Sequence, residues 1–121
     1  MPESEAVRLA SIDVNAEVTA AVDRVGVATA LASSIEIAMS EVREELSRSL
    51  SKRMLYQSDM ADAKARIAEG LTKEDASGLE QAAFLYERCD REVTRLRGTL
   101  DALKLRHTEA KARLALLTRK V

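Results

Sequence analysis

Apolar residues recur at alternating steps of three and four through the second half of the chain. This spacing continues without a break for six heptads, and the flanking positions are mostly charged. A 3.5-residue apolar period with charged edges is typical of a coiled-coil helix. We therefore expect one long helix over residues 73–121, with a seam that packs against another helix. The seam consists of Leu79, Ala82, Tyr86, Cys89, Val93, Leu96, Leu100, Leu103, His107, Ala110, Leu114, Leu117 and Val121.

The first half is also patterned as a helix, but its apolar steps are less regular. They often total eleven residues rather than seven, which does not favour a uniform left-handed supercoil. We expect a first helix over residues 1–69, with a hinge near residue 26 that would make the N-terminal segment a separate third helix. The apolar stripe consists of Val14, Val18, Val22, Val25, Ala28, Ala32, Ile35, Met39, Val42, Leu46, Leu50 and Met54.

The sequence places a tight turn between the two halves, within residues 70–78. Gly70 suits a helix C-terminus in the left-handed conformation, and Leu71 suits the position before a new N-cap. The Thr72 hydroxyl is expected to cap the amide of Asp75. Because a short turn forces neighbouring helices to run antiparallel, we predict an all-α fold: a long antiparallel two-helix hairpin, forming a single domain over residues 1–121.

Pairing residue i with about residue 142 − i leaves residues 1–20 without a partner in the hairpin. This overhang is apolar, and an apolar overhang must be covered, because each buried aliphatic side chain contributes roughly 1.5–3 kcal/mol. A second copy, a foreign subunit, a lipid surface or a fold-back of the segment itself would each cover it. The predicted partner-binding residues are Val7, Leu9, Ile12, Val14, Val18, Val27 and Leu31.

Composition supports long helices and narrows the function. The chain has one proline, four glycines and three aromatic residues among 121, with a net charge of −1. Residues 1–35 are acidic and residues 99–121 are basic, which we interpret as mutual compensation rather than as a nucleic-acid or phosphate site. The scarcity of aromatic rings argues against base stacking. A lone cysteine and the lack of a signal or transit peptide favour an intracellular protein, cytoplasmic by default, although a processed organellar protein would look the same.

Few residues carry candidate chemistry. His107 lies on the seam, opposite Ser33 and Ser34 in the predicted register, either as a hydrogen-bonded core histidine or as a polar, pH-sensitive contact. One histidine and the distant Cys89 give no metal site and no catalytic dyad. We expect no enzyme activity, no cofactor and no metal.

Two further features leave alternatives open. Tyr86 and Tyr56 either pair across the hairpin or, with Phe84, Leu85 and Leu55, form an exposed docking patch near the turn. A ridge of small residues at positions 26, 30 and 34 either packs against the C-terminal helix or contacts another subunit.

The sequence therefore predicts a non-enzymatic structural or adaptor subunit that assembles with other helices. The partner would be a helical protein or a second copy, not nucleic acid, and a membrane partner is not expected. The alternative is a helical hairpin that remodels a membrane surface or holds unfolded clients through its apolar N-terminal helix.

Overall fold

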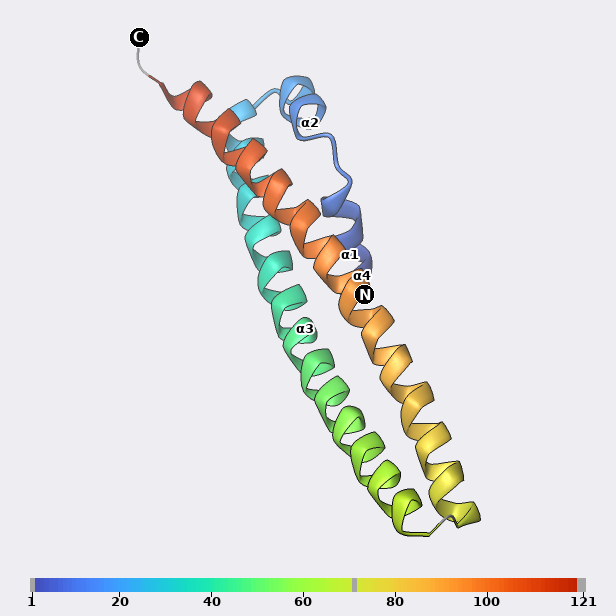
Figure 1. Cartoon of the computed structure of the whole chain (residues 1–121). Helices are drawn as coiled ribbons and strands as arrows, with labels where there is room; N and C mark the ends of the chain where they lie inside the picture. Colours follow the sequence, from blue (N-terminus) through green and yellow to red (C-terminus); the bar gives the residue numbers. More distant parts are fainter. Residues whose placement is uncertain (1, 71, 120–121) are drawn as a thin grey trace. The chain divides into compact units, whose positions relative to one another are not determined.

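A computed structural model describes residues 2–70 and 72–119, with side chains from residue 5 onward. The described chain is all-α and comprises α1 (Pro2–Ala10), α2 (Val14–Ala20), α3 (Arg24–Glu69) and α4 (Lys73–Thr118) (Figure 1). The two long helices pack against each other, which confirms the predicted helical hairpin. The chain divides into two compact units, and each is described separately below: unit 1 (Met1–Glu44 and Arg97–Val121) and unit 2 (Glu45–Leu96). The prediction of a single domain stays a prediction.

The predicted antiparallel register is confirmed within each unit. In unit 2, Arg53 Nη1 lies 2.7 Å from Asp90 Oδ1. In unit 1, His107 Nε2 lies 3.1 Å from Glu36 Oε1. Each of these contacts is within one residue of the position that pairing i with 142 − i gives. The hairpin therefore keeps the registration that the position of its turn imposes.

The seam of α4 is covered as its heptad pattern predicts. Every seam position from Leu79 to Leu117 is buried or half-buried, and Val121 lies outside the described residues. Val93 and Leu96 are 1% exposed and Leu103 is fully buried. Because consecutive seam residues are three or four positions apart, they lie along one edge of α4, and this edge is mostly apolar.

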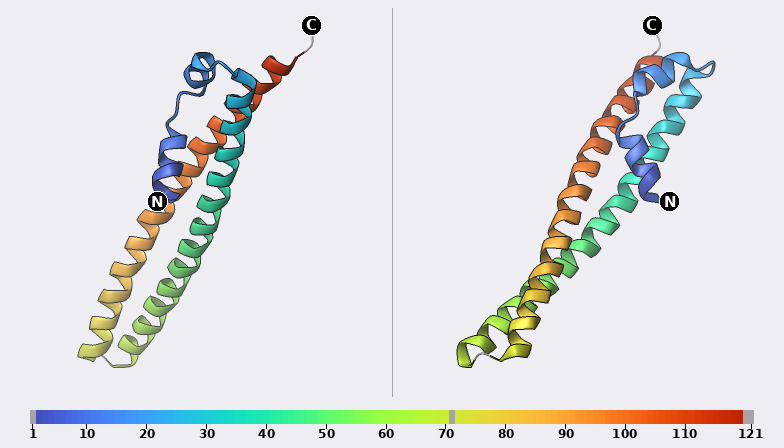
Figure 2. Two further views of the ribbon diagram at one scale, coloured as in Figure 1. Left: turned by 180° about the vertical axis from the view of Figure 1, so that it is seen from behind. Right: turned by 90° about the vertical axis from the view of Figure 1, so that its right-hand side faces the viewer.

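The N-terminal segment folds back in unit 1, so the expected first helix over residues 1–69 is interrupted before residue 24, as the alternative of a hinge and a separate N-terminal segment predicts. This segment forms two short helices, α1 and α2, rather than one. The carboxylate of Asp13 accepts from the N–H of Ala16 (3.1 Å) at the start of α2. The carboxylate of Asp23 accepts from the N–H of Gly26 (2.9 Å) at the start of α3. These N-caps fix two breaks in the helix, and the second break precedes the expected hinge by a few residues. Figure 2 shows α1 and α2 lying against the parts of α3 and α4 that belong to unit 1.

The turn of unit 2 begins α4 as predicted. The hydroxyl of Thr72 accepts from the N–H of Asp75 (3.1 Å) and donates to its carboxylate (2.6 Å). The left-handed Gly70 is wrong: no described glycine has a positive φ. Instead the Gly70 N–H donates to the carbonyl of Arg66 at 3.1 Å, an ordinary α-helical bond that extends α3 to its end. Leu71, expected before the cap, lies outside the described residues.

Candidate helix-binding surfaces

Most of the predicted partner-binding residues are covered by the chain itself. Leu9, Val14 and Val18 are fully buried in unit 1. Ile12, Val27 and Leu31 are half-buried, whereas Val7 is 49% exposed. Of the four coverings that the sequence left open, the structure contains the fold-back. A partner could reach the buried members only if α1 and α2 moved away, so their role in binding a partner stays a prediction.

Two arginines of α4 attach the folded-back segment. Arg106 donates from Nε to the carbonyl of Ala10 (3.1 Å), the last residue of α1, and forms an ion pair with Glu109 (2.8 Å). Arg113 donates from Nη2 to the hydroxyl of Thr19 on α2 (3.2 Å). The Nε of Arg113 is buried without a partner among the described residues. The sequence analysis missed both attachments, because an arginine on a helix carries no local sign of a distant acceptor.

The small-residue ridge of α3 faces away from α4 in unit 1. Ala28 and Ala32, which lie on the seam side, are 0% and 8% exposed. Ala30 and Ser34 are exposed instead. Gly26 has a local explanation, since a Cβ there would overlap the Asp23 carboxylate that caps the helix. The structure therefore favours the alternative in which the ridge is available to a second helix.

The outward side of α3 is also apolar beyond this ridge. Val25 is 40% exposed and Ile37 is 61% exposed, with exposed Thr29, Ala30 and Ser33 between them. The helix contains an 18-residue stretch with a mean hydropathy of 1.3, of which only 33% is buried. By length and composition alone, such a stretch also satisfies the criteria for a membrane span. The side of α3 that carries Val25 and Ile37, with small and hydroxyl residues between them, is thus left uncovered in unit 1.

Three acidic side chains of the N-terminal segment, Glu5, Asp13 and Asp23, make local contacts in unit 1. Glu5 forms its ion pair with Arg8 one turn later (2.7 Å), and the hydrogen bond from Arg8 lowers the pKa of Glu5. The carboxylates of Asp13 and Asp23 accept from backbone amides of their own helices. These three acidic side chains therefore act locally, and the expected mutual compensation between residues 1–35 and 99–121 stays a prediction.

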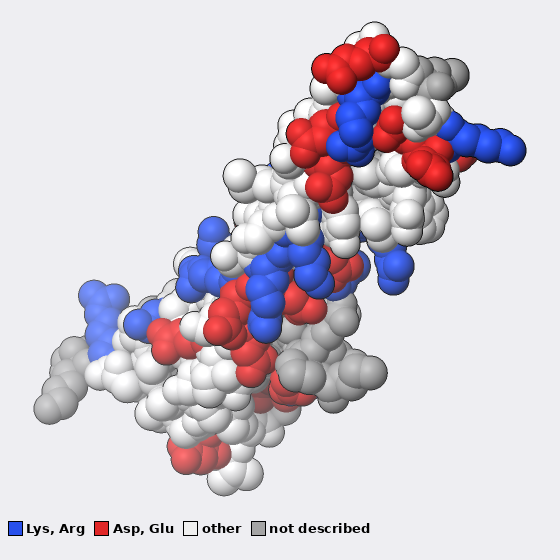
Figure 3. Space-filling model, turned by 90° about the horizontal axis from the view of Figure 1, so that it is seen from below, with Lys and Arg blue, Asp and Glu red and all other residues white. Residues whose placement is uncertain are grey.

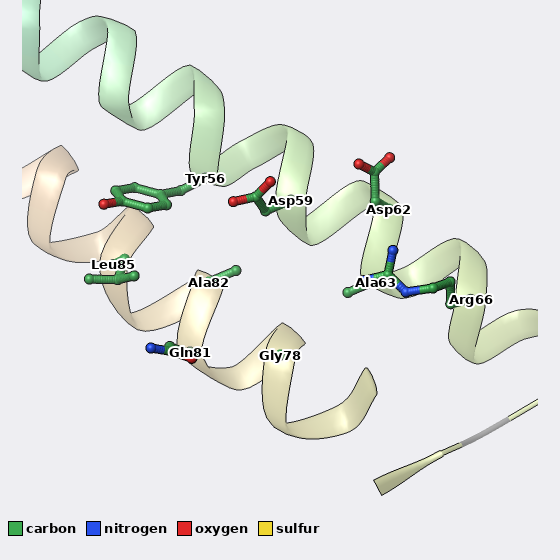
Figure 4. A pocket seen from close by; sticks show the side chains of 9 residues that line it. All are labelled: Tyr56, Asp59, Asp62, Ala63, Arg66, Gly78, Gln81, Ala82 and Leu85. Carbon is green, nitrogen blue, oxygen red and sulfur yellow. The ribbon is translucent and has the colours of Figure 1, made fainter. Parts of the chain in front are cut away.

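Unit 2 contains a shallow groove between its two helices near the turn (Figure 4). Ala63 and Ala82 are 1% and 7% exposed, and their small side chains leave a depression of about 260 Å³ between α3 and α4. The ring of Tyr56 extends toward α4, whereas the carboxylate of Asp62 points away from it. The groove is lined by Tyr56, Asp59, Asp62, Ala63, Arg66, Gly78, Gln81, Ala82 and Leu85.

The predicted aromatic neighbourhood in unit 2 is partly on the surface. Phe84 and Leu55 are 63% and 58% exposed, and Met54, the last member of the predicted stripe, is 69% exposed. Tyr56 and Tyr86 are half-buried. Exposure of Phe84 and Leu55 agrees with the docking alternative. The pairing of the two tyrosine rings stays a prediction.

His107 contacts an acid rather than a serine. Its imidazole, 20% exposed, lies against the Glu36 carboxylate, 58% exposed, while Ser33 and Ser34 face outward. The expected serine partners are therefore wrong, because Glu36, two residues beyond Ser34, reaches the ring. The contact is an ion pair only when the imidazole is protonated. Cys89 is a half-buried free thiol.

Lys and Arg side chains lie among Asp and Glu side chains on the face seen in Figure 3. Among the described residues, no group of three or more His, Cys, Asp or Glu side chains could hold a metal ion. Comparison of the chain with models of protein families, with curated proteins and with solved structures finds no match.

Proposed function

We propose that this chain is a non-enzymatic structural or adaptor subunit that assembles with other proteins through helix–helix packing. The observation that supports this proposal is the uncovered apolar side of α3 in unit 1. Its two large exposed side chains, Val25 and Ile37, are separated by small residues. Apolar area removed from water stabilises a complex by roughly 25 cal/mol per Å² before the entropy cost of association.

The side-chain sizes on this face suit a helix as its partner. Small residues allow two helix axes to approach closely, and a large residue such as Ile37 can insert between side chains of the second helix. The partner is either a second copy or a different helical protein. The fold-back of α1 and α2 leaves this face, rather than the N-terminal segment, as the surface that requires no rearrangement before binding.

The first experiment is to measure the absolute mass by light scattering over a concentration series. The wild-type chain, 13.3 kDa as a monomer, is compared with Ile37→Glu and with a matched control, Met54→Glu, which changes a 69% exposed apolar side chain of unit 2 outside the predicted docking patch. Self-assembly through α3 predicts a heavier wild-type species that Ile37→Glu dissociates and the control does not.

If the wild-type chain is a monomer, the same variants are compared for the proteins that they bind in an extract of the native cell. Assembly with a different protein predicts a stoichiometric complex that Ile37→Glu weakens and Met54→Glu does not. If wild type and Ile37→Glu retain identical masses and identical bound proteins, the proposal is wrong.

A membrane-surface role is the second candidate, and the hydropathy of the α3 stretch favours it. Flotation with phosphatidylcholine and phosphatidylserine vesicles separates it from the first. Binding to vesicles that Ile37→Glu abolishes, without any protein assembly, would assign the α3 face to lipid. A holding chaperone that uses the N-terminal segment stays a prediction, and it would first require release of the buried Leu9 and Val14.

A further inference from the structure

A second exposed face, on α4 of unit 1, carries a regular charge pattern. Arg97, Lys104 and Lys111 are spaced by seven residues, and all three side chains are exposed. Seven residues make nearly two helical turns, so these cations follow one edge of the helix. None of them forms a hydrogen bond or ion pair through its side chain with another residue in the part of the chain that the structure describes.

Apolar side chains lie directly beside this edge. Leu105 and Ala112 each follow a lysine, and both are exposed. Leu116 lies one turn beyond Ala112, and the exposed fractions of Leu105 and Leu116 are 53% and 61%. The seam that contacts α3 uses other positions, such as the fully buried Leu103. The helix therefore has a second apolar line, bordered by cations at heptad spacing.

In coiled coils, charges along the edge of an apolar seam select the partner through interhelical ion pairs. Asp101, also exposed, lies between Arg97 and Lys104 on this side of the helix, so three cations and one anion leave a net charge of +2. This charge favours a partner helix with Asp or Glu along its own edge.

Cations without a side-chain partner among the described residues border this apolar line on one side only, since on the other side Arg106 pairs with Glu109 and Arg113 donates to the hydroxyl of Thr19. A helix adapted to a lipid surface would be expected to have a predominantly basic polar face on both sides.

We propose that this face of α4 binds an acidic amphipathic helix of another protein. Leu105 and Leu116 would pack against apolar residues of that helix, and Arg97, Lys104 and Lys111 would pair with its carboxylates. The inference rests on the proposed function, because it names the partner chemistry of an assembly subunit. It uses a different face from the one on α3.

The test uses a labelled synthetic amphipathic peptide of about four heptads, with leucine at its seam and glutamate along its edges. Fluorescence anisotropy measures its binding to the full chain. The double variant K104E/K111E should weaken binding by at least about tenfold, since each reversal replaces an attraction with a repulsion. It should also bind the otherwise identical lysine peptide more tightly than the wild type does. The matched control K52E/K64E changes two exposed lysines of unit 2 by the same charge and should retain wild-type affinity.

The inference is overturned if wild type does not bind the glutamate peptide, or if K104E/K111E and the control lose affinity equally. It is also overturned if the wild type binds phosphatidylserine vesicles instead of the peptide through these lysines. Ile37→Glu should leave peptide binding unchanged. If Ile37→Glu abolishes assembly while K104E/K111E binds the peptide as wild type does, only this inference fails. If instead K104E/K111E loses peptide binding while Ile37→Glu leaves assembly unchanged, the proposal for the α3 face fails and the proposal for the α4 face stands.

Discussion

Substitution of Leu9 by alanine tests whether the N-terminal segment packs onto unit 1 in solution. The Leu9 side chain lies on α1 and is fully buried. Shortening it leaves a cavity where a branched side chain was in contact with its neighbours. Fully buried Leu→Ala substitutions cost about 2–5 kcal/mol of unfolding free energy, depending on how far the surroundings relax. The position of Leu9 predicts a cost in this range if α1 stays attached.

Detachment of the segment would limit that cost. Helices α1 and α2 have nine and seven residues. Isolated helices this short are unstable in water, so detached residues would lose their helical structure. Leu9→Ala releases the segment if the cavity costs more free energy than the contacts that hold residues 2–20 on unit 1 contribute. The rest of unit 1 then keeps most of its stability. Hydrogen exchange distinguishes these cases, because release removes protection from α1 and α2 selectively.

The assay combines thermal unfolding by circular dichroism with hydrogen exchange measured by mass spectrometry. For a chain of this size, 1 kcal/mol corresponds to roughly 4 °C in the melting temperature, so an attached α1 predicts a decrease of about 8–20 °C. Val7→Ala is the control: its side chain is 49% exposed on the same helix. That substitution should change stability by less than about 1 kcal/mol. Equal melting temperatures and equal exchange for the two variants would refute the packing of Leu9.

The other predictions concern the seam and the turn. Replacement of Leu100, 8% exposed on the seam, by alanine should lower the free energy of unfolding by about 2–5 kcal/mol. The same change at Leu105, 53% exposed, should have little effect; urea denaturation measures both. Similar losses for both would contradict the heptad assignment. Hydrogen bonds from Thr72 and Arg66 lower the pKa of Asp75 from its ordinary value of 3.8. A carboxyl with a lowered folded-state pKa contributes stability above its unfolded pKa, and this is lost as pH falls through the folded value. Asp75→Asn should therefore destabilise unit 2 at neutral pH and weaken its dependence on pH below about 4; an unchanged pH profile would contradict this role.

The hairpin itself could be predicted because its signals are local. The heptads of α4 require only that residues three and four apart share a face, and every seam position up to Leu117 is covered. The Thr72 cap fixes where α4 begins. A turn of a few residues then sets the register, which the contact between Arg53 and Asp90 confirms to within one residue. The identity of a contact across the hairpin is harder to predict, since side-chain reach decides it: Glu36 rather than a serine contacts His107.

The predicted stripe of the first half is wrong at three members, Val22, Val25 and Met54, which are exposed. Val22 lies in the break between α2 and α3 and is fully exposed, because the apolar spacing continues across residues that are not helical. Asp13 and Asp23 mark the two breaks as N-caps, and this signal was present in the sequence but was not used. At the other end of the stripe, Met54 is exposed while the neighbouring Arg53 is half-buried, so the inward positions of α3 change from steps of four to a step of three.

The fold-back could not be chosen from the sequence because the hydrophobic effect has no direction. Burial of Leu9 and Val14 is equally favourable against the chain itself, a second copy or a foreign helix, so the same apolar pattern predicts all of these outcomes. What favours the intramolecular solution is the short distance between two capped breaks, which lets α1 and α2 return onto unit 1 without a long loop. Because α1 and α2 cover the buried surface of unit 1, the proposed assembly uses faces that remain exposed: the side of α3 with Ile37 and the side of α4 with Leu105 and its neighbouring cations.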